Sequence, residues 1–255
     1  MPNSEAAEGP FLADRTWEDI RDRDPARCLA ILPVGATEAH GPHLPLAADV
    51  VIAEAMATAG ARILRERGQD ALVLPSFAYT AAPFAADFPG TVSVAPETVS
   101  ALLVDVARSL TGQGFRGLVL ANSHLDPAHL GSLQAGVDRC AAEGLLPVHF
   151  PNLTRKPWAL RMGDEFRTGA CHAGRYETSV VLAARPDLVR DAVARALPAN
   201  PASLSAAIGS GKTSFAEADG PRAYFGWPAD ATSAEGRELI DVLGGIVADC
   251  VNIAA

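Results

Sequence analysis

Four short apolar runs, each bounded by turn-forming residues, predict buried β-strands. They read CLAILPVGA (28–36), DALVLPSFA (70–78), RGLVLANS (116–123) and LLPVHF (145–150). Runs of this length without strict polar alternation are typical of strands covered on both faces.

Between these runs, apolar residues recur at three- and four-residue spacings, which predicts helices over 49–68, 95–114 and 127–144. Two later helices are predicted over 174–196 and 232–252, whereas 199–230 has no clear period and is expected to be a loop. Strands that alternate with helices indicate a parallel sheet with crossover helices. We therefore predict an α/β fold, with three α/β/α layers around a mainly parallel central sheet, in a single domain of residues 1–255.

The composition excludes some classes of binding partner. The 255 residues carry a formal charge of −9 without a Lys/Arg cluster, which argues against a nucleic-acid partner. The N-terminal MPNSEAAEGPFLADRTW lacks the features of a signal peptide, and no apolar run approaches the roughly 20 residues of a membrane span. The four cysteines lack CxxC spacing and are expected to be reduced. These features predict a cytoplasmic protein with a small-molecule partner and no membrane partner.

Two stretches rich in metal-ligand side chains directly follow predicted strands. Glu38, His40 and Asp49 come after the first strand, and His124 and Asp126 come after the third. Open α/β sheets place their sites at the carboxyl ends of strands, and side chains two residues apart in extended chain point to one side. The set therefore offers five oxygen and nitrogen ligands to one region, of types that suit Zn²⁺ or Mn²⁺. Five ligands, one of them a carboxylate able to bridge, suggest two ions that share an activated water.

Each of these residues also has an ordinary structural explanation. A single His is more often a core or surface residue, and Asp49 could simply cap the helix that begins near Val50. Two carboxylate–imidazole pairs at two strand ends make coincidence the weaker explanation.

A third stretch, CHAGRYETS (171–179), places His172 just before a predicted helix and Glu177 one turn into it. An imidazole at this position could shuttle protons near neutral pH. Taken alone, the stretch could equally be a helix cap with an incidental His.

The segment IGSGKTSF (208–215) ends like a phosphate-binding P-loop. The first glycine of that motif would fall at position 206, which is Ala, and no strand precedes it. We expect a flexible loop that could cover the site.

At several places the chain resembles the creatininase (creatinine amidohydrolase) family. The resemblance is carried by LPVGATEAHGPHLPLAAD (32–49), FPGTVSV (88–94), HAGRYETSVVLAARPDLV (172–189) and GWPADATSAEGREL (226–239), with Trp17 in the position of a T-W-x-E segment. It spans nearly the whole chain and implies a creatininase-like fold.

The resemblance implies roles for individual residues. Glu38, His40 and Asp49 match metal ligands of the first motif, with Asp49 as the bridge, and His124 matches a further ligand. Creatininase has a Glu ligand where this chain has Asp126, whereas many relatives have Gly there. His172 resembles a residue that relays protons and contacts the substrate. Glu177 resembles a residue at or near the metals, and His43 is expected to support the ligands.

Departures from the family pattern bear on the substrate. Leu125 replaces a small Gly of the family pattern. Cys171 is among the residues just before HAG, where creatininase presents a Trp-Asp pair to its ligand. Phe84 lies upstream of FPGT, where relatives often have Glu-His. We expect Leu125, Cys171 and Phe84 to contact the substrate, and creatinine not to be that substrate. Cys171 could in principle act as a nucleophile, but a metal-activated water is the better-supported attacker.

We therefore predict a metal-dependent amidohydrolase that cleaves a C–N amide bond in a cyclic amide, formamide or short peptide-like molecule. Two divalent ions (Zn, Mn or Fe) are expected in a homo-oligomer, with a hexamer as one form. One alternative is a family member that binds metal or ligand without turnover. Another is a lactone or ester hydrolase that uses the same site.

Overall fold

The computed structural model describes residues 9–252 and has four parallel strands. They are β1 (Cys28–Val34), β2 (Asp70–Val73), β3 (Gly117–Asn122) and β4 (Val148–His149), in the order β2-β1-β3-β4. Residues 1–8, which are the first part of the segment predicted not to be a signal peptide, and residues 253–255 lie outside the described residues.

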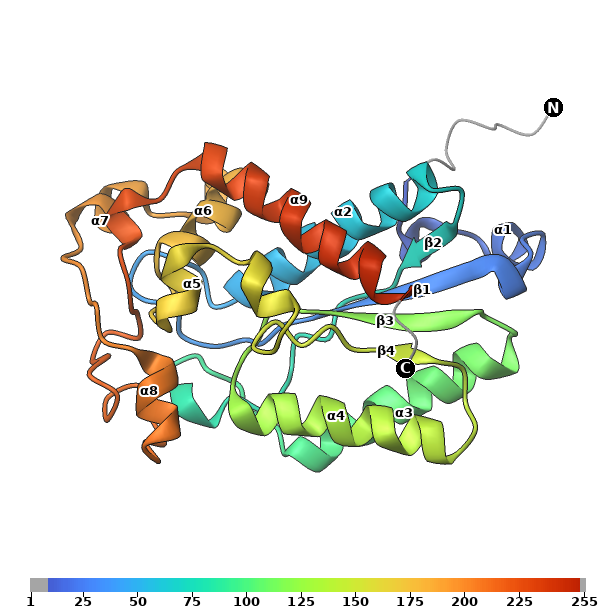
Figure 1. Cartoon of the computed structure of the whole chain (residues 1–255), viewed down its shortest axis with the longest axis horizontal. Helices are drawn as coiled ribbons and strands as arrows, with labels where there is room; N and C mark the ends of the chain where they lie inside the picture. The colour runs from blue at the N-terminus through green and yellow to red at the C-terminus, as the bar shows by residue number, and fades with distance from the viewer. Residues whose placement is uncertain (1–8, 253–255) are drawn as a thin grey trace.

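Helices cover both faces of the sheet (Figure 1). On one face lie α2 (Ala48–Glu66), α6 (Arg175–Ala184) and α9 (Ser233–Cys250), which pack against one another, and on the other lie α3 (Pro96–Gly112) and α4 (Pro127–Ala142). The predicted three-layer α/β/α fold is confirmed.

The side chains of β1 explain why both faces must be covered. Leu29 and Ile31 belong to the apolar core beneath α2 and α9, and Ala30 and Leu32 belong to the core beneath α3 and α4. Successive side chains of a strand point to opposite faces, so an apolar run without alternation feeds two cores at once.

Shorter helices lie mainly around the carboxyl edge of the sheet. The α-helices are α1 (Trp17–Arg21), α5 (Asp164–Thr168), α7 (Asp191–Ala196) and α8 (Leu204–Gly209). The 3₁₀ turns are η2 (Leu12–Asp14), η3 (Pro25–Arg27), η4 (Pro83–Ala85), η5 (Trp158–Arg161), η6 (Pro186–Leu188) and η7 (Pro228–Asp230).

Two predicted elements were wrong in extent. The helix expected over 174–196 ends at Ala184, because Pro186 restricts the preceding Arg185 to a non-helical backbone conformation (φ −144°, ψ 69°). The stretch 199–230, expected to be a loop, contains α8, which Ser203 caps by accepting a hydrogen bond from the Ala206 N–H. Prolines also shorten strands, with Pro75 following β2 and Pro147 preceding β4. Among the described residues, none of the helices is long and apolar enough to span a bilayer.

Candidate metal centre

The loop after β1 carries Glu38 and His40 into the protein interior. Gly35 lets this loop pass against the start of α2, because a Cβ there would lie 2.5 Å from the backbone nitrogen of Val50. Gly41 then turns the chain with a left-handed φ of +63°. The Glu38 N–H donates to the Leu46 carbonyl at 3.0 Å, which holds the two sides of the loop together.

Five buried side chains from four chain segments meet at this edge of the sheet. Two groups share Asp49, the first with Glu38 and His124 and the second with His40 and Glu177, and within each group the ligand atoms lie within 4.8 Å of one another. All five side chains are at most 4% exposed: Glu38, His40, Asp49, His124 and Glu177.

Asp49 lies between the two histidines of the cluster. Its Oδ1 is 3.2 Å from His40 Nε2, and its Oδ2 is 3.0 Å from His124 Nδ1. Glu38 Oε1 is 3.2 Å from the same His124 nitrogen, and Glu177 Oε2 is 3.5 Å from His40 Nε2. Each carboxylate oxygen of Asp49 therefore faces a different group, which is the arrangement that a bridging ligand requires.

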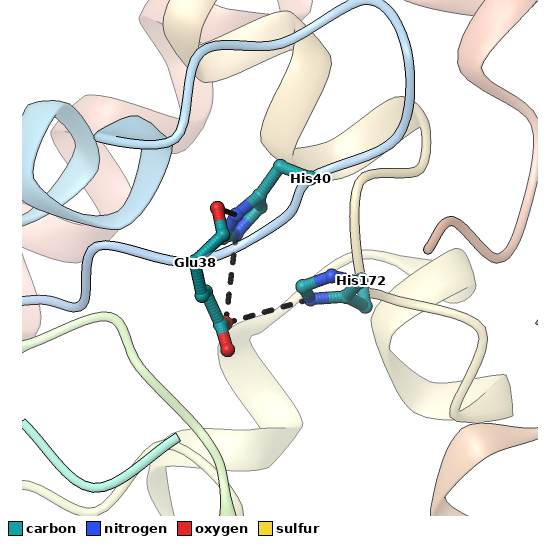
Figure 2. A group of neighbouring side chains, drawn as sticks. All are labelled: Glu38, His40 and His172. Carbon is teal, nitrogen blue, oxygen red and sulfur yellow. Dashed lines mark hydrogen bonds and ion pairs between the residues drawn. The ribbon is translucent and has the colours of Figure 1, made fainter. Parts of the chain in front are cut away.

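Backbone carbonyls fix the orientation of two imidazoles. His124 Nε2 lies 2.9 Å from the Ala81 carbonyl and must donate to it, which leaves Nδ1 to face the carboxylates. His172 Nε2 donates in the same way to the Ala39 carbonyl at 2.9 Å. Figure 2 shows the His172 ring directed toward Glu38, with 4.0 Å between Nδ1 and Glu38 Oε1. His172 also forms a third group with Glu38 and His40.

Burial and the charges of neighbouring side chains together shift the pKa values of the cluster residues. Burial lowers the pKa of His40, but Asp49, Glu177 and Glu38 outweigh it and raise this pKa to about 10. Burial raises the pKa of Glu177 to about 8, although His40 opposes the shift. Burial and the neighbouring His40 hold the pKa of His172 well below its usual range. Burial and a neighbouring cation therefore both favour the neutral form of His172.

The cluster fits divalent cations. Glu38 Oε2 is buried without a hydrogen-bond partner, and Asp49 Oδ2 has only the close His124 nitrogen, without hydrogen-bond geometry. Buried carboxylate oxygens without donors are costly unless a cation satisfies them. Three carboxylates and two imidazoles are the ligand types that Zn²⁺, Mn²⁺ and Fe²⁺ accept.

The structure does not bring Asp126 into this cluster. Its Oδ1 accepts from the Ala128 N–H at 2.8 Å as the N-cap of α4, and its Oδ2 accepts from the Phe84 N–H at 3.1 Å. The helix-capping role that was considered for Asp49 is therefore filled by Asp126, in a different helix. The N-cap of α2 is Ala47, and Asp49 lies inside the first turn.

Several supporting residues were not identified from the sequence. Buried Glu165 accepts three backbone N–H bonds, from Arg175 at 2.8 Å, Tyr176 at 2.6 Å and Trp227 at 2.8 Å, and so holds the start of α6. Buried His129 lies 2.9 Å from Asn122 Oδ1 and packs beside the ring of His124. No spacing rule predicts such contacts. The predicted supporting residue His43 lies 2.8 Å from the Thr178 hydroxyl, one residue after Glu177.

A cavity of about 460 Å³ opens onto the cluster. The three residues expected to contact substrate, Phe84, Leu125 and Cys171, all line it, as does His172. Segment 199–230 contributes Leu204, Ser205, Ile208 and Phe215 to its wall. Burial raises the pKa of the Cys171 thiol well above its ordinary value, which argues against Cys171 as a nucleophile.

Known proteins resemble this chain over most of its length. The family model for creatininase (creatinine amidohydrolase) matches residues 13–251. A mycofactocin precursor peptide peptidase from Mycobacterium tuberculosis is 35% identical over 230 residues, which is 88% of this chain and 84% of that protein. A creatinine amidohydrolase from Pseudomonas putida is 28% identical over 201 residues, 70% of this chain and 73% of that protein. The solved structure of a manganese creatininase superposes with a TM-score of 0.73 at 24% identity, covering 96% of this chain and 98% of that one.

Proposed function

The chain belongs to the creatininase family of metal-dependent amidohydrolases, and on that premise we propose that it hydrolyses a C–N amide bond in a short peptide-like substrate, using two divalent ions. The observation that carries the proposal is the pair of buried ligand groups that share Asp49. The proposed ligands are Glu38, Asp49 and His124 for one ion and His40, Asp49 and Glu177 for the other. Asp126 remains a proposed additional ligand only if its two backbone hydrogen bonds give way.

The chain's own groups would divide the work of amide hydrolysis. When bound, the ions would polarise the amide carbonyl and supply a water acidic enough to attack near neutral pH. His172, whose Nε2 donates to the Ala39 carbonyl and whose Nδ1 faces Glu38, would accept a proton on Nδ1 and return it to the leaving nitrogen of the amide. Phe215 packs against the His172 ring, with 4.2 Å between the ring centroids, and would hold that ring in place.

A peptide-like substrate is favoured over creatinine by two observations. The 35% identical relative is a peptidase, whereas the creatinine amidohydrolase is 28% identical. The cavity wall is apolar around Leu125 and Phe215, which suits a hydrophobic side chain better than a small polar ring. We also propose a cytoplasmic homo-oligomer, in which the four free cysteines would remain reduced.

The test combines metal content with activity. Purified protein should contain close to two divalent ions per chain by elemental analysis and should hydrolyse N-acylated dipeptides. Glu38→Gln should lower kcat by at least about 100-fold, because it removes a ligand beside His124. The exposed Glu238→Gln on α9 is the matched control and should retain both ions and full activity.

The alternatives give different results in the same assays. A protein that keeps its ions but hydrolyses no amide, ester or lactone would be a binding protein. A protein that hydrolyses lactones or esters but no amide would be the lactone or ester hydrolase. Activity that survives in Glu38→Gln would refute the metal mechanism.

A further inference from the structure

The ionisable residues around the cavity are arranged by sign. At its buried end lie the carboxylates of the metal-ligand cluster, such as Glu38 and Asp49. The exposed ionisable side chains in the lining are Lys156 and Arg167, and both are cations. On a chain of net charge −9, a cavity mouth whose exposed charges are all positive is a local reversal of the overall charge.

Among the described residues, neither cation forms an ion pair with a carboxylate that lines the cavity. Asp126 lines the cavity, and its two oxygens accept backbone hydrogen bonds from Ala128 and Phe84. Arg167 pairs through one terminal nitrogen with Asp164, which is 83% exposed and does not line the cavity. An exposed pair of this kind contributes little energy, so the guanidinium can bind a second carboxylate at small cost.

Apolar side chains make up most of the other large residues in the lining. Phe166 precedes Arg167 in α5, and Leu160 lies four residues after Lys156. The large apolar lining residues are Phe84, Leu125, Leu160, Phe166, Leu204, Ile208 and Phe215. A ligand that occupies the whole cavity would therefore meet the buried carboxylates, an apolar surface and two exposed cations.

We propose that Lys156 and Arg167 form a carboxylate-binding subsite, so that the substrate is an amide whose amine half is an apolar amino acid or short peptide with a free carboxyl terminus. This proposal rests on the proposed amidohydrolase function. In the reaction the amide C–N bond breaks, the hydroxyl of water goes to the carbonyl carbon and its proton goes to the nitrogen. The products are a carboxylic acid and an amino acid or peptide with a free amine. The cavity volume of about 460 Å³ lies in the range that accommodates ligands of this size.

The activity test uses metal-loaded protein and two substrates that differ in one group, N-acetyl-Ala-Phe and its carboxamide. We expect the free acid to have at least a 10-fold higher kcat/KM. The double variant Lys156→Gln/Arg167→Gln should bring the ratio to within 2-fold, by lowering kcat/KM for the free acid. Arg155→Gln removes an exposed cation outside the lining and is the matched control, which should keep the preference. Added salt should weaken the preference, because exposed charges are screened.

A binding measurement separates failure of the subsite from failure of the proposed function. Ketomethylene isosteres of the two substrates cannot be hydrolysed, and calorimetry on metal-loaded protein should show at least 10-fold tighter binding of the acid form, lost in the double variant. Equal binding of both forms, or a preference that survives in the double variant, would overturn the subsite even if both substrates are hydrolysed. Selective binding of the acid form with no hydrolysis of either substrate would support the subsite and count against the peptide amidohydrolase function. Charge reversal by Lys156→Glu/Arg167→Glu should favour an aminoethylamide terminus over the acid, which a merely unfolded variant would not do.

Discussion

Replacing Glu165 should destabilise the start of α6 and with it the metal centre. The Glu165 carboxylate is 4% exposed and accepts the N–H groups of Arg175, Tyr176 and Trp227. Glu165→Ala would leave three donors in the interior without a partner. A buried unsatisfied group costs about 1–3 kcal/mol, and water that enters the vacated space would recover part of this cost. We expect the free energy of unfolding to fall by about 3–5 kcal/mol.

Glu165→Gln separates hydrogen bonding from charge. Burial raises the pKa of Glu165 despite its three backbone hydrogen bonds, so the negative charge itself adds little to stability. A glutamine keeps one carbonyl oxygen that can accept from Arg175 and Trp227, which share Glu165 Oε1. The cost should therefore be less than half of that for alanine.

Urea denaturation of metal-free protein at pH 7 measures both variants on one scale. Asp164→Ala is the control, because this neighbouring carboxylate is exposed and should cost less than about 1 kcal/mol. The reasoning is refuted if Glu165→Ala is as stable as this control, or if glutamine costs as much as alanine. Metal affinity should fall in the same order as stability, since Glu177 and His172 flank the segment that Glu165 holds.

Three further predictions concern the candidate metal centre and the loop that carries Glu38 and His40. Asp49→Asn should lose both ions, whereas Glu177→Gln should lose one, as elemental analysis would reveal; equal stoichiometry in the two variants would contradict a shared ligand. Metal binding at pH 7 should release protons, because the pKa of His40 is raised to about 10 in the metal-free protein and the ions require the unprotonated ring. The affinity for the metal ions should therefore fall as the pH drops. Calorimetry in buffers of different ionisation enthalpy would count the protons released, and a count of zero would contradict His40 as a ligand. Gly35→Ala should lower the free energy of unfolding by about 2 kcal/mol or more, because its Cβ would meet Val50 at 2.5 Å; thermal unfolding unchanged from the parent would refute that packing.

The sequence predicted the sheet well because its strands are continuous apolar runs. Each run supplies two cores, and turn residues mark its ends, so the positions of the strands and their parallel direction follow from local signals. The helix predicted over 174–196 is too long because the apolar period continues past Pro186, whereas the helix itself ends at Ala184. A residue before proline rarely stays helical, so Pro186 is the local signal for this end.

The positions of some candidate site residues follow from the sheet topology, whereas those of others depend on contacts with distant segments. Glu38, His40 and His124 follow strand ends directly, so the topology alone brings them to one edge. Asp126 has the same kind of position, but its carboxylate serves the first turn of α4 and the Phe84 backbone, a choice that depends on a distant segment. Glu177 joins the buried group of His40 and Asp49 because α6 docks against α2, and periodicity does not indicate which helices will dock.

The position of Glu177 also bears on how the protein folds. Glu38 and Glu177 lie in distant parts of the chain, and the β1–β3 pairing and the docking of α6 must both form before the two ligand groups exist together. Contacts of such high sequence separation carry a large loop-closure cost and form slowly. An ion added to the unfolded chain therefore has no complete site to bind and should leave the refolding rate unchanged. It should instead slow unfolding, because it binds and stabilises the folded state after that state has formed.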